Sequence, residues 1–178
     1  MAAPDGIDPA TRYNATARTL HAIIAVLVIG SLVGGLLQDD LPKTWNVIPL
    51  HKSMGLTILA LSVARILWRF TWKTPVYKPP VKSSELLLAR LVHGVFYALL
   101  LVMPLSGWIF SSAGKYPLAW FGVPVPKFGV TKADPIVGLA SEAHEILGYA
   151  MAALVILHIA AALRHHFLLK DKVLRRMW

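Results

Sequence analysis

The stretch EAHEILGYAMAALVILH, residues 142–158, decides the fold class because it places two histidines in a largely apolar segment. His144 and His158 are 14 residues apart. This separation is just under four helical turns, so both side chains project from one helix face, roughly 21 Å apart along the axis. Residues 146–163 contain no acidic or basic side chain other than His158. The segment therefore predicts a membrane-spanning helix with two imidazoles on one face.

Three more segments have the length and apolar character of membrane spans. Leu20–Leu37 and Leu91–Gly114 each contain a single histidine, and Leu50–Trp72 also contains Arg65 at depth. We therefore predict an all-α integral membrane four-helix bundle over residues 16–168. No internal repeat is apparent. The expected helices lie near 16–37, 50–72, 86–110 and 142–168, with an N-terminal arm (1–15), an outer loop (111–141) and a basic tail (169–178).

The composition agrees with a membrane protein and excludes several other classes. The 178 residues are 56% hydrophobic and only 15% charged, whereas soluble domains carry about 25% charged residues. The net charge of +9 alone would suit nucleic acid, but beside this hydrophobicity it favours a membrane partner. The absence of cysteine excludes disulfides, thiolate metal sites and haem attached through cysteine.

The distribution of basic residues predicts the orientation. Of the 18 Lys and Arg residues, 13 lie in or beside the N-terminal arm, the connection between the second and third spans, and the tail. Cytoplasmic loops carry an excess of Lys and Arg. We therefore expect both termini in the cytoplasm, with four spans between them.

The depths of the histidines predict two bis-histidine sites. His51 opens the second span at its outer end, at the level of His144, and His21 lies near the inner end of the first span, at the level of His158. Bundle cores hold cofactors between facing helices, and haem iron accepts axial imidazoles. The pairs His51/His144 and His21/His158 therefore predict two non-covalent b-type haems stacked across the membrane.

Glycines and arginines support this interpretation. Gly55 and Gly148 each follow a predicted ligand by four residues, which leaves room for a flat macrocycle beside the backbone. The alternative is that they only permit close helix packing. Arg65 and Arg18 lie near the inner pair and would contact anionic haem propionates. Alternatively, Arg65 snorkels to the surface and Arg18 is an ordinary inner-side charge.

Three other histidines lie near the inner surface. His93, His165 and His166 are explained as interfacial polar residues, but His165 and His166 are also candidates for a quinone or proton site. Neutral imidazole titrates near physiological pH and can move protons beside a quinone.

These motifs resemble those of the bacterial cytochrome b-561 family of small four-helix di-haem proteins and, within it, the superoxide-oxidising members. The resemblance implies a multi-pass protein of the bacterial inner membrane. The resemblance covers most of the chain beyond the first dozen residues, and the family's haem ligands fall on the four histidines paired above. The matching stretches are RTLH (18–21), PLHKSMG (49–55), LVH (91–93), MPLSG (103–107), EAHEILG (142–148), and LH (157–158) through HHF (165–167).

The resemblance implies that superoxide is oxidised at the outer surface and that ubiquinone in the membrane accepts the electrons. Lys43, Lys52 and Lys115 are then candidates for steering the anion. The charges on the outer side sum to zero, however, so an electron-transfer subunit remains the alternative. Such a subunit would link a dehydrogenase, hydrogenase or other redox partner protein to the quinone pool. A haem-free membrane protein such as a small transporter is a third, less favoured interpretation.

Overall fold

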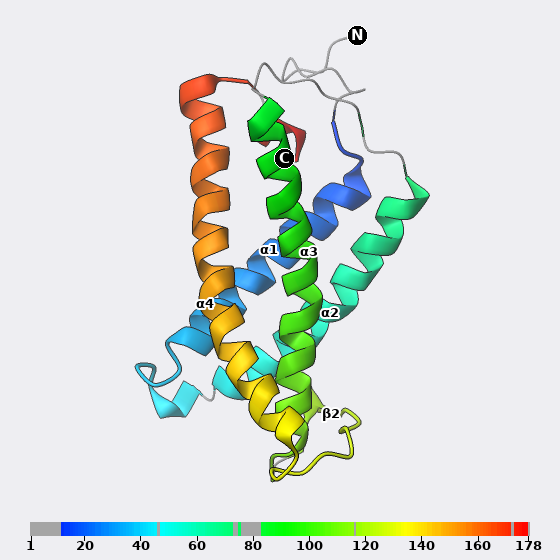
Figure 1. Ribbon diagram of the computed structural model, residues 1–178, viewed down its shortest axis with the longest axis vertical. Coiled ribbons are helices and arrows are strands. Elements are labelled where there is room, and N and C mark those ends of the chain that lie inside the picture. Colours follow the sequence, from blue (N-terminus) through cyan, green and yellow to red (C-terminus); the bar gives the residue numbers. More distant parts are fainter. Residues whose placement is uncertain are drawn as a thin grey trace.

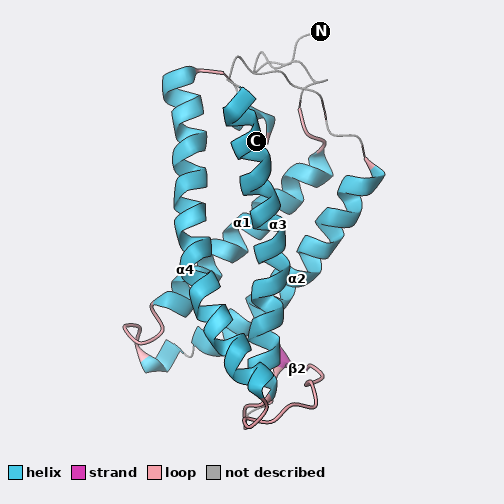
Figure 2. Ribbon diagram, in the orientation of Figure 1, coloured by secondary structure: helices cyan, strands magenta, loops and turns pink. Residues whose placement is uncertain are grey.

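The computed structural model describes residues 12–45, 47–72, 75, 83–115, 117–171 and 173–177. Four long helices make up most of them (Figures 1 and 2). Each helix is long and apolar enough to cross a membrane. The chain is therefore an all-α four-helix membrane bundle, as predicted. The helices are α1 (Ala15–Leu36), α2 (Val47–Thr71), α3 (Ser83–Ser112) and α4 (Pro135–Arg164).

The helices pack as two pairs around a thin apolar centre. Helix α1 packs mainly against α2, and α3 mainly against α4, while α2 also contacts α3. All four helices contribute to one buried cluster, formed by Ile24, Val28, Ile58, Leu99 and Met151. Many other large apolar side chains remain exposed along the helices. This pattern suits a bundle whose outer surface faces lipid instead of water.

Helix α4 begins earlier than the sequence suggested. It starts at Pro135, directly after Asp134, so the expected start near residue 142 is wrong. Proline is favoured in the first helical turn because its missing N–H would be unpaired there. The Asp134 carboxylate accepts hydrogen bonds from the backbone and side chain of Thr131, and these bonds hold the pKa of Asp134 below its usual range. The ionised carboxylate then lies favourably at the positive end of the helix.

The outer connection is correspondingly shorter than predicted and forms an ordered cap. A hairpin pairs β1 (Ala119–Trp120) with β2 (Val123–Pro124). Its turn has positive φ at Phe121 and Gly122, as tight hairpin turns require. The backbone N–H of Phe121 donates to Ser53 Oγ at 3.0 Å, and Trp120 Nε1 donates to Thr57 Oγ1 at 2.9 Å. The cap is thus tied to the outer half of α2.

Both ends of the described chain meet at the opposite end of the bundle (Figure 1). Tyr13 N donates to the Arg176 carbonyl at 3.2 Å, and the Arg176 guanidinium lies 5.2 Å from the Tyr13 ring centre. Helix α4 continues into a π-helix, η3 (His165–Leu169), which ends at Lys170 with φ 52°. Short 3-10 turns occur at η2 (Lys43–Trp45) and η4 (Leu174–Arg176). Both termini therefore lie on one side of the membrane, and the basic charge predicts that this side is the cytoplasm.

Single-cysteine labelling tests this orientation, since the natural chain contains no cysteine. Lys132→Cys lies exposed in the outer cap, and Ser83→Cys lies exposed at the inner start of α3. We expect a membrane-impermeant maleimide to label the first variant on intact spheroplasts and the second only after the membrane is permeabilised. The unsubstituted chain is the blank. The reverse labelling pattern would show that the bundle is inserted the other way.

Candidate functional site

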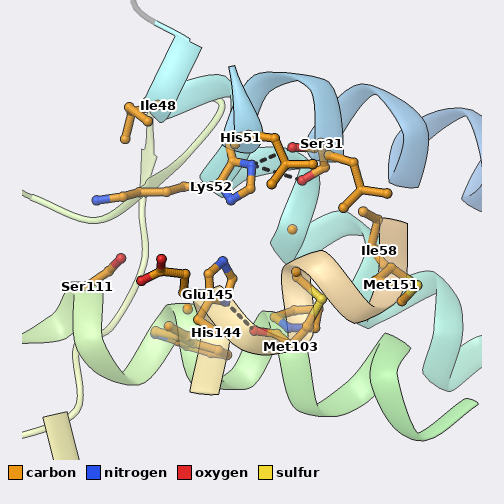
Figure 3. A pocket seen from close by; sticks show the side chains of 18 of the residues that line it. Ser31, Ile48, His51, Lys52, Ile58, Met103, Ser111, His144, Glu145 and Met151 are labelled. Atoms are coloured by element: carbon orange, nitrogen blue, oxygen red, sulfur yellow. Dashed lines mark hydrogen bonds between the residues drawn. The ribbon is translucent and has the colours of Figure 1, made fainter. Parts of the chain in front are cut away.

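At the outer level, α2 and α4 point two imidazoles toward each other. The ring centres of His51 and His144 are 5.9 Å apart, with nearly perpendicular planes. Figure 3 shows the two rings facing one another from opposite sides of a cavity. A metal about 2 Å from each nitrogen separates opposed imidazole centres by roughly 6 Å. The spacing of this pair therefore suits two axial ligands of one iron.

Each outer imidazole is held through Nδ1 by the neighbouring helix of its own pair. His51 Nδ1 donates to the Ser31 carbonyl at 2.9 Å and lies 3.0 Å from Ser31 Oγ. His144 Nδ1 donates to the Met103 carbonyl at 3.0 Å and lies 3.2 Å from Ser106 Oγ. A proton on Nδ1 leaves the Nε2 lone pair free, which is the usual state of a metal-bound histidine. Both side chains thus present a free Nε2 atom that could bind iron.

The cavity between these rings has a volume of about 600 Å³, within the usual range for small-molecule and cofactor sites. Gly55 and Gly148 both line it, at the positions where we predicted space for a macrocycle. A Cβ on Gly55 would meet no atom within 4 Å, and one on Gly148 would meet only Met103 Cε at 3.9 Å. The donor set and the free space together fit a haem.

Two further glycines, which we did not predict, make room for the imidazoles themselves. A Cβ on Gly35 would lie 2.9 Å from His51 Cε1, and a Cβ on Gly107 would lie 3.0 Å from His144 Cε1. Only glycine therefore lets each ring come this close to the helix that holds it.

The mouth of the cavity carries mixed charge. Lys52, Glu145 and Asp39 all line the cavity, and Lys52 and Glu145 extend toward the same end of it in Figure 3. Of the other predicted steering lysines, Lys115 is exposed and does not line the cavity. The side chain of Lys43 lies outside the described part of the structure. Among the candidate steering lysines, the structure thus brings only Lys52 to the site.

At the inner level, α1 and α4 bring His21 and His158 together, with ring centres 6.4 Å apart and planes tilted by 53°. Arg65 Nη1 donates to the Ala17 carbonyl at 3.2 Å. Arg18 Nε is buried and lacks a hydrogen-bond partner among the described residues. A buried guanidinium nitrogen without an acceptor is costly, so the site suits an anionic group such as a propionate.

The two consecutive histidines after α4 have different surroundings. His165 Nδ1 lies 2.5 Å from Asp171 Oδ2, and the Asp171 side chain is almost fully buried. His166 instead packs its ring against Phe167. The structure therefore separates the pair that we considered together, and it adds Asp171, which the sequence did not bring to attention.

Comparison with known proteins agrees with this geometry. The family model for prokaryotic cytochrome b561 matches residues 12–178. The chain belongs to the prokaryotic cytochrome b561 family. It is a multi-pass bacterial membrane protein that transfers electrons and binds b-type haem.

Relatives in this family cover nearly the whole chain. Cytochrome b561 homolog 2 of Escherichia coli (strain K12) is 31% identical over 173 residues, covering 93% of this chain and 90% of the relative. A protein of Yersinia pestis named probable superoxide oxidase CybB is 31% identical over 170 residues, covering 93% and 95%. Cytochrome b562 of Cereibacter sphaeroides is 28% identical over 176 residues, covering 93% and 94%.

Substitution of adjacent glycines tests the outer site of this cytochrome b561. We expect Gly35→Ala to weaken haem binding at the outer level, because the new Cβ collides with the His51 ring. Overpacking of this kind costs about 1–3 kcal/mol, or a roughly 5- to 150-fold loss of affinity. The haem-to-protein ratio of the purified protein is measured as the protein is progressively diluted.

The matched control is Gly34→Ala. Gly34 is buried and Gly35 is partly buried, but a Cβ on Gly34 would meet no atom within 4 Å. Equal haem loss in the two variants would mean that Gly35 is not needed to make space for the His51 ring.

Proposed function

We propose that this cytochrome carries two b-type haems, one at each level, and moves electrons from superoxide outside the inner membrane to ubiquinone at the cytoplasmic end. The observation that carries the proposal is the stacking of two imidazole pairs along one bundle. Helix α4 contributes to both pairs through His144 and His158, which are roughly 21 Å apart along its axis. His51 and His21 face them from α2 and α1.

The polar residues around each level support this division of roles. Bound haem supplies reversible one-electron chemistry at both levels. At the inner level, Arg18 and Arg65 provide cations for the propionates. A cation in a membrane span costs about 2.5–3.5 kcal/mol at the helix centre, and an anionic partner offsets that cost. At the outer level, Lys52 is the one Lys or Arg among the described residues that line the cavity, so it is the candidate cation for a propionate or an incoming anion.

The substrate proposal rests on the relative named probable superoxide oxidase and on Lys52 at the cavity mouth. Two superoxide anions become two dioxygen molecules and release two electrons. One ubiquinone takes up these electrons with two protons and becomes ubiquinol. The chain therefore needs a proton-transferring group at the end where the quinone is reduced.

His165 is suited to that task. Its Nδ1 is held by the buried Asp171 carboxylate, and its Nε2 is left to exchange a proton with a bound ligand. The side chain of His165 is 21% exposed at the end of α4. It is therefore reachable from the membrane interface, where a quinone headgroup lies.

Superoxide-driven quinone reduction by the purified protein tests the proposal. Potassium superoxide and a short-chain ubiquinone are supplied without any other protein, and ubiquinol is measured. We expect one ubiquinol for every two superoxide anions oxidised. His144→Ala should lose the outer haem and this activity, but retain the inner haem.

The alternative is a subunit that passes electrons between a redox partner protein and the quinone pool. The cavity is lined by two acidic residues, Asp39 and Glu145, and by one basic residue, Lys52. This excess of negative charge favours the alternative, because no net attraction for an anion results. Slow ubiquinol formation with superoxide alone, together with rapid haem oxidation by quinone, would favour this alternative.

Substitution of neighbouring histidines tests the proton-transfer proposal. We expect His165→Ala to slow ubiquinol formation about 100-fold, as loss of general acid catalysis does. Haem content and superoxide-driven haem reduction should not change. His166→Ala is the matched control, because its ring packs on Phe167. Equal slowing in both variants would place the quinone site elsewhere.

A further inference from the structure

The two helix pairs repeat the same spacings of functional residues, although no repeat is apparent in the sequence. Helices α1 and α3 each contain a histidine near the inner end. Ten residues after it comes the residue whose carbonyl accepts a hydrogen bond from an outer imidazole, and 14 residues after it comes the glycine next to that imidazole. In α2 and α4, an outer ligand is followed by a glycine after four residues and by an inner-level residue after 14. The matched sets are His21, Ser31 and Gly35 with His93, Met103 and Gly107, and His51, Gly55 and Arg65 with His144, Gly148 and His158.

The outer level obeys this two-fold relation in its two ligands, the carbonyls that hold them and the glycines beside them. His51 and His144 are equivalent, and both are held by a carbonyl and a serine hydroxyl. The inner level obeys it only in part, because α2 carries Arg65 where α4 carries His158. The other equivalent pair at this level is His21 and His93. Three imidazoles are therefore present at the inner level, although one iron has only two axial positions.

The position of His93 makes it a chemical equivalent of His21. The His93 and His158 ring centres are 5.7 Å apart, with planes at 87°. These values are closer to the outer pair, at 5.9 Å and 87°, than are the 6.4 Å and 53° of His21 and His158.

Like the outer ligands, His93 donates from Nδ1 to a main-chain carbonyl, although this carbonyl belongs to its own helix. Its Nδ1 donates to the Ala89 carbonyl at 2.5 Å, which leaves the Nε2 lone pair free. The side chain is exposed at the surface of α3, so the ring can move without disturbing the buried cluster.

We propose that the inner haem has one fixed axial ligand, His158, and two interchangeable ones, His21 and His93. This inference rests on the proposed di-haem arrangement. The outer level has no third histidine of this kind, because His51 and His144 are the only histidines among the described residues that line its cavity. The two levels should therefore respond differently to the loss of one histidine.

Haem stoichiometry in four variants tests the inference. His21→Asn should retain two haems per chain, because His93 replaces the missing ligand. His51→Asn, the matched loss at the outer level, should retain only one. The double variant His21→Asn/His93→Asn should lose the inner haem, and His93→Asn alone should keep both. Low-temperature EPR of oxidised His21→Asn should show a low-spin inner haem with a shifted signal, because the angle between the imidazole planes has changed.

The outer haem serves as an internal standard for folding, so a variant that retains it is folded. A wild-type protein with fewer than two haems would refute the di-haem proposal itself. If the wild type binds two haems and His21→Asn retains only the outer one, or retains a high-spin inner haem, the reserve role of His93 is wrong. Retention of a low-spin inner haem in the double variant would also show that His93 is not the replacement ligand.

Discussion

The bond between Nδ1 of a buried histidine and a main-chain carbonyl of the adjacent helix is the interaction on which the outer site depends. An imidazole inside a membrane bundle must satisfy its polar atoms within the protein, since lipid supplies no partner. The Ser31 and Met103 carbonyls do this for His51 and His144. The same bonds direct the two free Nε2 atoms into the cavity, so one constraint provides both stability and ligand orientation.

Most of the fold could be predicted because its signals are long and repetitive. Four apolar segments determine four spans, and the 14-residue spacing in α4 determines which histidines share a face. The pairs His51/His144 and His21/His158 then follow from depth alone, and the structure brings each pair together at about 6 Å. The predicted start of α4 was wrong because a proline in the sequence fits a loop as well as the first turn of a helix, and Pro135 begins the helix.

The supporting residues of the site could not be predicted, because their roles depend on contacts between helices. Nothing in the sequence distinguishes Gly35 from Gly34, yet only Gly35 lies against the His51 ring. The Met103 carbonyl is a backbone group and has no signature of its own. Asp171 is paired with His165 only because the π-helix and the turn at Lys170 bring the chain back. The spacing repeat was missed for a similar reason, since its matched positions carry different residues, such as Ser31 and Met103.

The two-fold relation between the helix pairs breaks where charge must be balanced. In the proposed arrangement, Lys52 would supply a cation for the propionates of an outer haem. The propionates of an inner haem would also need cations from the protein, and Arg18 and Arg65 would provide them. A fully symmetric inner level would have a fourth imidazole in place of Arg65 and would leave those anions without this cation. Replacing one potential ligand by arginine therefore solves an electrostatic problem, and it leaves three imidazoles where the symmetric arrangement would have four.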